Sequence, residues 1–276
     1  MGFERPQKLA QAVALLRASP RTILAGGTDL FPATTKQTLM GDILDISGIE
    51  DLRGISSDRK HVRIGSATTW SEIISADLPA SFNALKESAR EVGSIQIQNS
   101  GTIGGNLCNA SPAADGVPPL LVLDAEVELA SAKGLRSLPL SEFILGNRRT
   151  ALETGEVLTA VLIPNAALGG RSHFVKLGAR KHLVISIAMV AARLDVNAGR
   201  IRRAAISVGS CSEVAVRLPG LEEALRGVPA RDALGAVNAA YLAPSLSPID
   251  DIRADHDYRI HAAVELVKRA VSGVAQ

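Results

Sequence analysis

The N-terminal part of the chain has short segments of helical and of extended hydrophobic periodicity. Residues 8–18 carry apolar side chains at helical spacing, and Pro20 follows them, which predicts one amphipathic helix that ends before the proline. Residues 21–24 and 43–46 are short apolar runs and predict two strands. The strand at 21–24 runs directly into a pair of glycines, so we expect a tight turn there.

The middle of the chain carries clearer local signals. The sequence Thr69–Glu72 (TWSE) has the spacing of a capping box and predicts the start of a helix. Residues 83–92 predict a second helix, with Gly93 as the residue after its C-terminus. Strands are expected at 61–64, at 127–130 and 135–138 as a hairpin around Lys133–Gly134, and at 157–163.

Residues 165–170 have the composition of a linker, and we place a domain boundary close to residue 170. Beyond it, residues 184–196 and 201–208 flank a turn at 197–199 and predict a second hairpin. Helices are expected near 220–226, 231–241 and 258–271. The predicted class is therefore α+β, with an N-terminal domain at 1–168 and a smaller α+β C-terminal domain at 169–276.

Composition is that of a globular protein. The chain has 276 residues, of which 46% are hydrophobic and 21% charged, so either domain can build a core. Aromatic residues make up only 3%, too few for the stacking platforms of a single-strand nucleic-acid binder. The net charge of +2, with scattered Lys and Arg, does not indicate a polyanionic partner.

The termini and cysteines favour a cytoplasmic location. The first residues lack the pattern of a signal peptide, and no apolar stretch reaches the about 18 residues of a membrane-spanning helix, so no membrane insertion is expected. Cys108 and Cys211 are too few and too far apart to bind an iron–sulfur cluster by themselves. The five histidines show no ligand spacing, and no metal site is predicted.

Two diglycine sequences are the main candidate for chemistry: residues 25–30 (AGGTDL) and 101–106 (GTIGGN). A glycine pair allows backbone N–H groups to converge on one point and form a nest for a phosphate. Two nests about 75 residues apart suggest a diphosphate held from both sides, hence a dinucleotide. Ordinary tight turns are the alternative. Neither sequence matches the G-x-G-x-x-G or P-loop patterns.

The sequence resembles the FAD-binding medium subunit of molybdenum hydroxylases such as carbon monoxide dehydrogenase, and the flavin domain of xanthine dehydrogenase. The likeness runs nearly from end to end. It is most specific over residues 96–115 (QIQNSGTIGGNLCNASPAAD). Residues 3–6, 24–30, 64–68 and 176–180 contribute, as do Asp251–Arg253 and Tyr258–Arg259.

This resemblance implies a two-lobed FAD-binding domain of the p-cresol methylhydroxylase type, with lobes at about 1–55 and 56–168. It implies noncovalent FAD, with both diglycine sequences around the diphosphate, Asp115 at the adenosine ribose and Lys176 near the isoalloxazine. The cofactor-binding residues expected in full are Leu24, Ala25, Gly26, Gly27, Thr28, Asp29, Leu30, Thr102, Ile103, Gly104, Gly105, Asn106, Cys108, Asp115, Leu162, Ile163 and Lys176.

Other residues have plainer interpretations. Cys108 lies inside the second flavin-binding sequence, but with no base or second cysteine nearby we expect a small buried packing residue rather than a redox group. Arg148 and Arg149 are expected in a solvated turn, and Trp70 in the core or an interface. No residue pattern for direct catalysis on an organic substrate is present, and no catalytic residue is assigned.

The resemblance implies an oxidoreductase subunit that transfers electrons. A large molybdopterin-binding subunit would oxidise the substrate, a small subunit with 2Fe-2S clusters would relay electrons to this FAD, and an external acceptor would receive them. A dimer of heterotrimers is the implied assembly. Two alternatives remain: a self-sufficient flavin oxidase of the p-cresol methylhydroxylase superfamily, and a nonenzymatic nucleotide-binding module.

Overall fold

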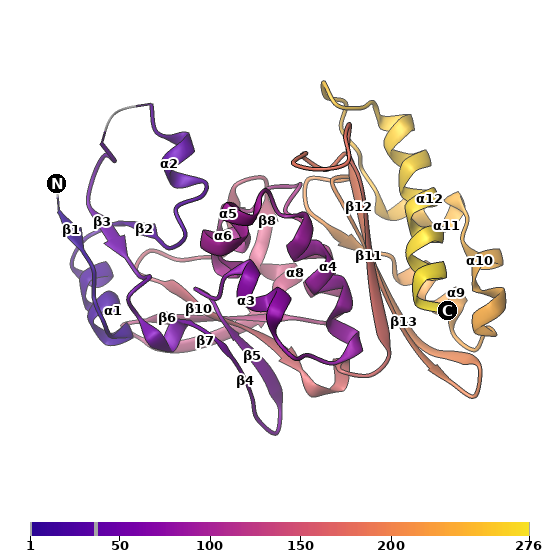
Figure 1. Ribbon diagram of the computed structural model, residues 1–276, viewed down its shortest axis with the longest axis horizontal. Coiled ribbons are helices and arrows are strands. Elements are labelled where there is room, and N and C mark those ends of the chain that lie inside the picture. Colours follow the sequence, from indigo (N-terminus) through magenta and orange to yellow (C-terminus); the bar gives the residue numbers. More distant parts are fainter. Residues whose placement is uncertain (1, 36–37, 276) are drawn as a thin grey trace.

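The computed structural model describes residues 2–35 and 38–275. Figure 1 shows three units in sequence order across the molecule: a small first lobe, a second lobe in the middle, and a C-terminal domain. Each unit is built around its own sheet. Within the described residues, no helix combines the length and the apolar character needed to cross a membrane.

The first lobe is a small parallel sheet with one covering helix. Its strands are β1 (Phe3–Glu4), β2 (Thr22–Leu24) and β3 (Ile43–Asp45), in the order β1-β3-β2. Helix α1 (Leu9–Ala18) buries its apolar stripe on this sheet, and the short helix α2 (Leu30–Ala33) follows β2. A 3-10 turn (Glu50–Leu52) leads to the second lobe.

The second lobe is an antiparallel sheet covered by helices. The sheet order is β4-β5-β10-β6-β7. Its strands are β4 (Ile55–Ser57), β5 (His61–Gly65), β6 (Glu126–Ser131), β7 (Gly134–Pro139) and β10 (Val157–Pro164), and a separate ribbon pairs β8 (Ile144–Gly146) with β9 (Arg149–Thr150). Its helices are α3 (Trp70–Ser75), α4 (Asn83–Glu91), α5 (Ile95–Ser100), α6 (Ile103–Asn109), α7 (Val117–Val122) and α8 (Leu140–Phe143), with a 3-10 turn at Ala80–Phe82.

The C-terminal domain packs a long helix on one face of a second antiparallel sheet (Figure 1). The sheet order is β11-β12-β13-β14, with β11 (Arg171–Leu177), β12 (Ala188–Asn197), β13 (Arg200–Gly209) and β14 (Val216–Arg217). Its helices are α9 (Pro219–Leu225), α10 (Ala233–Ala236), α11 (Ala239–Leu242) and α12 (His256–Ala275); 3-10 turns lie at Asn165–Ala167, Ala230–Asp232 and Ala243–Ser245.

Strand β12 joins the domains because both of its faces are buried. Ala188, Val190 and Ala192 face α12 in the domain's own core. Met189 and Ala191 alternate with them and pack against α4 and α7 of the second lobe. The same face carries Arg193, whose side chain is 1% exposed and donates to the Val122 carbonyl at 2.7 Å.

Most sequence predictions for individual elements are confirmed. Thr69 and Glu72 form the predicted capping box, with Thr69 Oγ1 accepting from the Glu72 N–H. The helices at 8–18 and 83–92 and both hairpins are present, although the strand expected from 184 begins at Ala188.

The predicted helix at 231–241 is wrong. It breaks between α10 and α11, where Asn238 caps α11 by accepting from the Ala240 N–H at 3.0 Å. Strand β11 and the helices α5, α6 and α7 were not predicted.

We predict that Arg193→Met destabilises the protein by about 3 kcal/mol, because it leaves the buried Val122 carbonyl and the part-buried Gly169 carbonyl without this donor and removes one of the three arginines that pair with Asp124. Arg202→Ala is the matched control, since it removes an exposed ion pair with Asp195 and should cost less than about 1 kcal/mol. Urea denaturation followed by circular dichroism measures both. Equal shifts in the two variants would contradict the structural role of Arg193.

Candidate functional site

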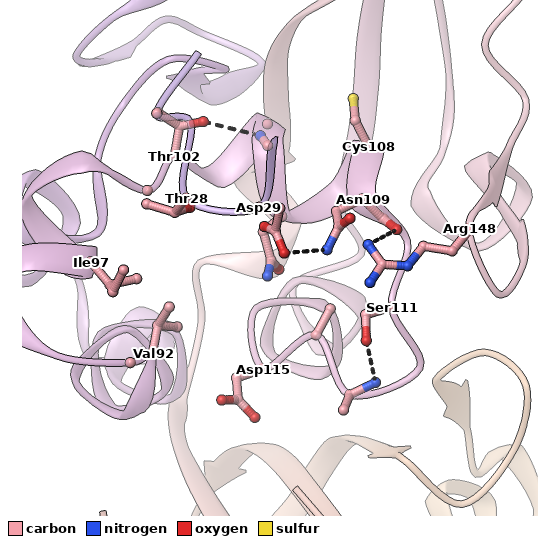
Figure 2. Close-up of a pocket in the computed structure, with 18 of the residues that line it drawn as sticks. Thr28, Asp29, Val92, Ile97, Thr102, Cys108, Asn109, Ser111, Asp115 and Arg148 are labelled. Atoms are coloured by element: carbon pink, nitrogen blue, oxygen red, sulfur yellow. Dashed lines mark hydrogen bonds between the residues drawn. The ribbon is translucent and has the colours of Figure 1, made fainter. Parts of the chain in front are cut away.

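One large cleft, of about 1400 Å³, lies where the three units meet. The first lobe contributes the segment after β2, the second lobe contributes α6 and the turns around it, and the C-terminal domain contributes the loop before β12. Figure 2 shows the polar residues of this cleft gathered around Asp29, Asn109 and Arg148, with Val92 and Ile97 together at another part of the wall.

The segment after β2 lies directly on the second lobe. A Cβ atom on Gly26 would lie 2.0 Å from the backbone oxygen of Ser100, so only glycine allows this approach. Gly27 has a φ of +71°, in the left-handed region where a side chain is disfavoured. Glycine is therefore required at position 26 for the close approach to Ser100 and is favoured at position 27 for the backbone conformation. Together the two residues allow the segment to lie against the wall of the cleft.

Five consecutive backbone N–H groups in this segment have no hydrogen-bond acceptor among the described residues: those of Gly26, Gly27, Thr28, Asp29 and Leu30. The next N–H, of Phe31, donates to the Gly27 carbonyl and begins α2. All five residues line the cleft. A run of unpaired amides at a cavity wall suits an anionic oxygen cluster such as a diphosphate.

The second diglycine sequence differs from the expected loop, because Gly104 and Gly105 lie in the first turn of α6. Their N–H groups already donate within the protein, Gly104 to the Ser66 carbonyl at 2.8 Å and Gly105 to Thr102 Oγ1 at 3.1 Å. Ile103 is fully buried in the core and does not line the cleft. The two glycine pairs are therefore not equivalent nests.

Unpaired side-chain atoms lie beside α6. Ser66 and Asn106 both line the cleft. Their side-chain oxygens, Ser66 Oγ and Asn106 Oδ1, are buried and have no hydrogen-bond partner among the described residues. Buried polar atoms of this kind are normally satisfied. Together with the free amides of the first lobe, they fit a cofactor with a polar chain such as FAD.

Asp115 and Lys176 contact each other, although the family resemblance implies different parts of the cofactor for them. Lys176 Nζ donates to one carboxylate oxygen of Asp115 at 2.6 Å, and Ser186 Oγ donates to the other at 2.6 Å. The pair spans the second lobe and the C-terminal domain, and both side chains are under 10% exposed. Burial raises the pKa of Asp115, while Lys176 and Ser186 oppose that rise.

Lys176 does not line the main cleft. It lines an adjoining cavity of about 390 Å³, which shares Glu91 and Val184 with the main cleft. Asp115 does line the main cleft. Lys176 therefore influences the main cleft through its ion pair with the Asp115 carboxylate.

Apolar side chains form another part of the cleft wall. Val92 and Ile97 come from the α4–α5 segment, and Leu183 and Ile185 come from the loop before β12. Leu183 and Ile185 are 54% and 55% exposed, and both line the cleft. An apolar, planar group would cover them. The sequence did not predict this surface, because the apolar run from residue 184 onward predicted a strand, whereas β12 begins only at Ala188.

The two residues of β10 that were expected to contact the cofactor, Leu162 and Ile163, do not lie at the cleft. Ile163 is fully buried in the core of the second lobe, and neither it nor Leu162 lines the cleft. The residues of this strand that do line it are Val157 and Leu158, at the other end of β10. An apolar strand with uniform character gives no sequence signal for which end meets the cavity.

Cys108 lines the cleft without the marks of a reactive thiol. Its side chain is exposed on the cleft wall, and desolvation by the surrounding protein raises the pKa of the thiol. No base contacts it among the described residues, and no cluster there could hold a metal ion. The expectation of a small buried packing residue is wrong, because the Cys108 side chain is exposed on the cleft wall.

The sequence matches two family models. Residues 1–166 match the FAD binding domain in molybdopterin dehydrogenase, and residues 173–274 match the CO dehydrogenase flavoprotein C-terminal domain.

Curated relatives agree with these matches. The chain is 30% identical over 277 residues to the xanthine dehydrogenase FAD-binding subunit of Escherichia coli O157:H7, covering 98% of this chain and 94% of that one. It is 36% identical over 237 residues to the nicotinate dehydrogenase FAD-subunit of Eubacterium barkeri, covering 82% and 80%. Among solved structures, it superposes on a chain of CO dehydrogenase from Oligotropha carboxidovorans with a TM-score of 0.91 and 30% identity, covering 100% and 97%.

We predict that Lys176→Met costs about 3 kcal/mol of stability at pH 7, because it leaves a buried carboxylate without its cation. The pKa of Asp115 lies above its ordinary value in the folded state, so the folded protein favours the protonated form. The deficit should therefore shrink as the pH falls toward the ordinary Asp value of about 4.

Urea midpoints at pH 7 and pH 5 measure this effect. The double variant Asp115→Asn/Lys176→Met is the control, since it removes both charges and should recover much of the loss at pH 7. A cost for Lys176→Met that does not change with pH would show that the ion pair is not its cause.

Proposed function

Because this chain belongs to the family of FAD-binding subunits of the molybdopterin dehydrogenases, we propose that it is the electron-transfer subunit of a molybdenum-containing hydroxylase. It would accept electrons from 2Fe-2S clusters of a small partner subunit and pass them to an external acceptor. A large molybdopterin-binding subunit would act on the substrate. We further propose that the three subunits assemble as a dimer of heterotrimers.

The observation that carries this proposal is the run of five free N–H groups at Gly26–Leu30 on the cleft wall. These donors would bind the diphosphate of noncovalent FAD, and Ser66 and Asn106 add polar atoms on the facing wall. Gly104 and Gly105 would contribute mainly close packing, since their own N–H groups are already bonded.

The apolar part of the cleft suits the isoalloxazine ring. Val92 and Ile97 would contact it from the second lobe, and Leu183 and Ile185 from the C-terminal domain, which excludes water from its faces. Asp115, held by Lys176 and Ser186, would accept from hydroxyl groups of the cofactor chain. When bound, FAD supplies the redox chemistry, and these residues bind and orient it.

We predict that FAD binds the purified chain and quenches the emission of Trp70, the single tryptophan, which is 1% exposed and lines the cleft. Gly26→Ala should weaken FAD binding at least tenfold, because its methyl group would collide with the Ser100 oxygen. Gly235→Ala is the matched control, since a Cβ there meets nothing within 4 Å.

Fluorescence titration gives the two affinities, and circular dichroism shows whether each variant is folded. A wild-type chain that gains neither a flavin spectrum nor quenching with FAD would support the nucleotide-module alternative instead.

We predict that the FAD-loaded chain alone does not oxidise nicotinate, xanthine or carbon monoxide, whereas its flavin absorbance bleaches with the right substrate once both partner subunits are added. Anaerobic absorbance spectroscopy at the flavin band measures this, and dithionite serves as the control that the flavin is reducible. Substrate turnover by the isolated chain would favour the flavin-oxidase alternative.

A further inference from the structure

Arg148 lies in the exposed turn that its sequence predicted, and it also lines the cleft. It occupies the turn between β8 and β9, and its side chain points toward Asn109 in Figure 2. The neighbouring Arg149 does not line the cleft, and its guanidinium donates to the Leu145 carbonyl at 3.0 Å. Two adjacent arginines of the same turn are therefore placed differently.

The backbone holds Arg148 in an unfavourable conformation. Its φ is +58°, in the left-handed region that non-glycine residues rarely adopt, and Ala110 has a φ of +46°. The Arg148 N–H donates to the Ala110 carbonyl at 2.9 Å, so each strained residue fixes the other. Strain of this kind is retained where the surrounding structure requires it, often at binding sites.

Among the described residues, the Arg148 guanidinium lines the cleft without a carboxylate partner. Of the other arginines that line the cleft, Arg253 and Arg259 both pair with Asp251, and Arg21 lies beside Asp42. Arg148 makes no ion pair within the described residues; its one side-chain hydrogen bond there is a long one, 3.4 Å, to the Asn109 carbonyl. Most of its N–H donors remain free to bind an anion.

The surroundings of Arg148 connect it to the free amides of the first lobe. Asn109 Nδ2 donates to Asp29 Oδ1 at 3.0 Å, so Asn109 contacts Arg148 through its carbonyl and Asp29 through its side chain. Asp29 is one of the five residues with a free N–H, yet it adds a negative charge beside them. A cation close by would offset that charge for an incoming anion.

We propose that Arg148 binds a phosphate oxygen of an organic diphosphate in the cleft. This inference rests on the proposed function. The phosphate belongs either to FAD itself or to a phosphorylated electron acceptor that enters the same cleft. Guanidinium groups suit this role, because their forked donors match the oxygens of a phosphate.

Arg148→Gly tests the charge without adding strain, since glycine adopts the left-handed region freely. Arg148→Lys retains the charge, and Arg149→Ala is the matched control from the same turn. FAD affinity is measured by titration at two salt concentrations, and binding of ADP-ribose to the FAD-loaded chain by calorimetry. ADP-ribose serves as a redox-inactive organic diphosphate.

If the diphosphate is that of FAD, Arg148→Gly weakens FAD binding about tenfold and reduces its salt dependence, while Arg148→Lys loses less. If it is that of an acceptor, FAD affinity is unchanged and ADP-ribose binding falls about tenfold. Unchanged affinity for both ligands, or an equal loss in Arg149→Ala, overturns the proposal. Failure of the wild-type chain to bind FAD is a separate result and contradicts the proposed function instead.

Discussion

The cleft depends on one close approach between backbones, that of Gly26 to Ser100. The first lobe has only a three-stranded sheet, and its core is completed by Ala67, Ala130 and Val157 of the second lobe. With no side chain on Gly26, the segment after β2 lies directly against the end of α5. This contact brings the free amides of the first lobe to the wall that α6 forms, and a methyl group there would separate them.

Signals that are local in sequence predicted local structure well. The capping box at Thr69–Glu72 and the turns of both hairpins specify their own geometry through neighbouring residues, and the structure contains them. The second diglycine sequence is the opposite case. Glycines disfavour a helix, but Thr102 caps this one, and the N–H groups of Ile103 and Gly104 bond to Thr68 and Ser66. Those acceptors lie more than 30 residues away, and no local pattern reveals them.

The residues of the candidate site also fall into those that the sequence predicted and those that it did not. The resemblance identified both glycine pairs and Asp115, all of which line the cleft. It could not show that the Asp115 carboxylate contacts Lys176, because they meet only when the C-terminal domain docks. Arg148 and the exposed aliphatic residues Leu183 and Ile185 were missed because each comes from a short connection with unremarkable composition. Their relevance arises from which segments the fold brings to one cavity.

The walls of the cleft are held together by interactions of different strength. The second lobe and the C-terminal domain share the buried ion pair Asp115–Lys176 and the pair between the buried Arg193 and the partly exposed Asp124, and separating the two units would leave these charges without their partners. The first lobe is held by apolar contacts, by backbone packing at Gly26 and by the exposed hydrogen bond from Asn109 to Asp29. Separating it breaks no buried ion pair within the described residues. The second lobe and the C-terminal domain are therefore held together more strongly than the first lobe is held to them. The free amides lie on the first lobe, which requires less free energy to displace.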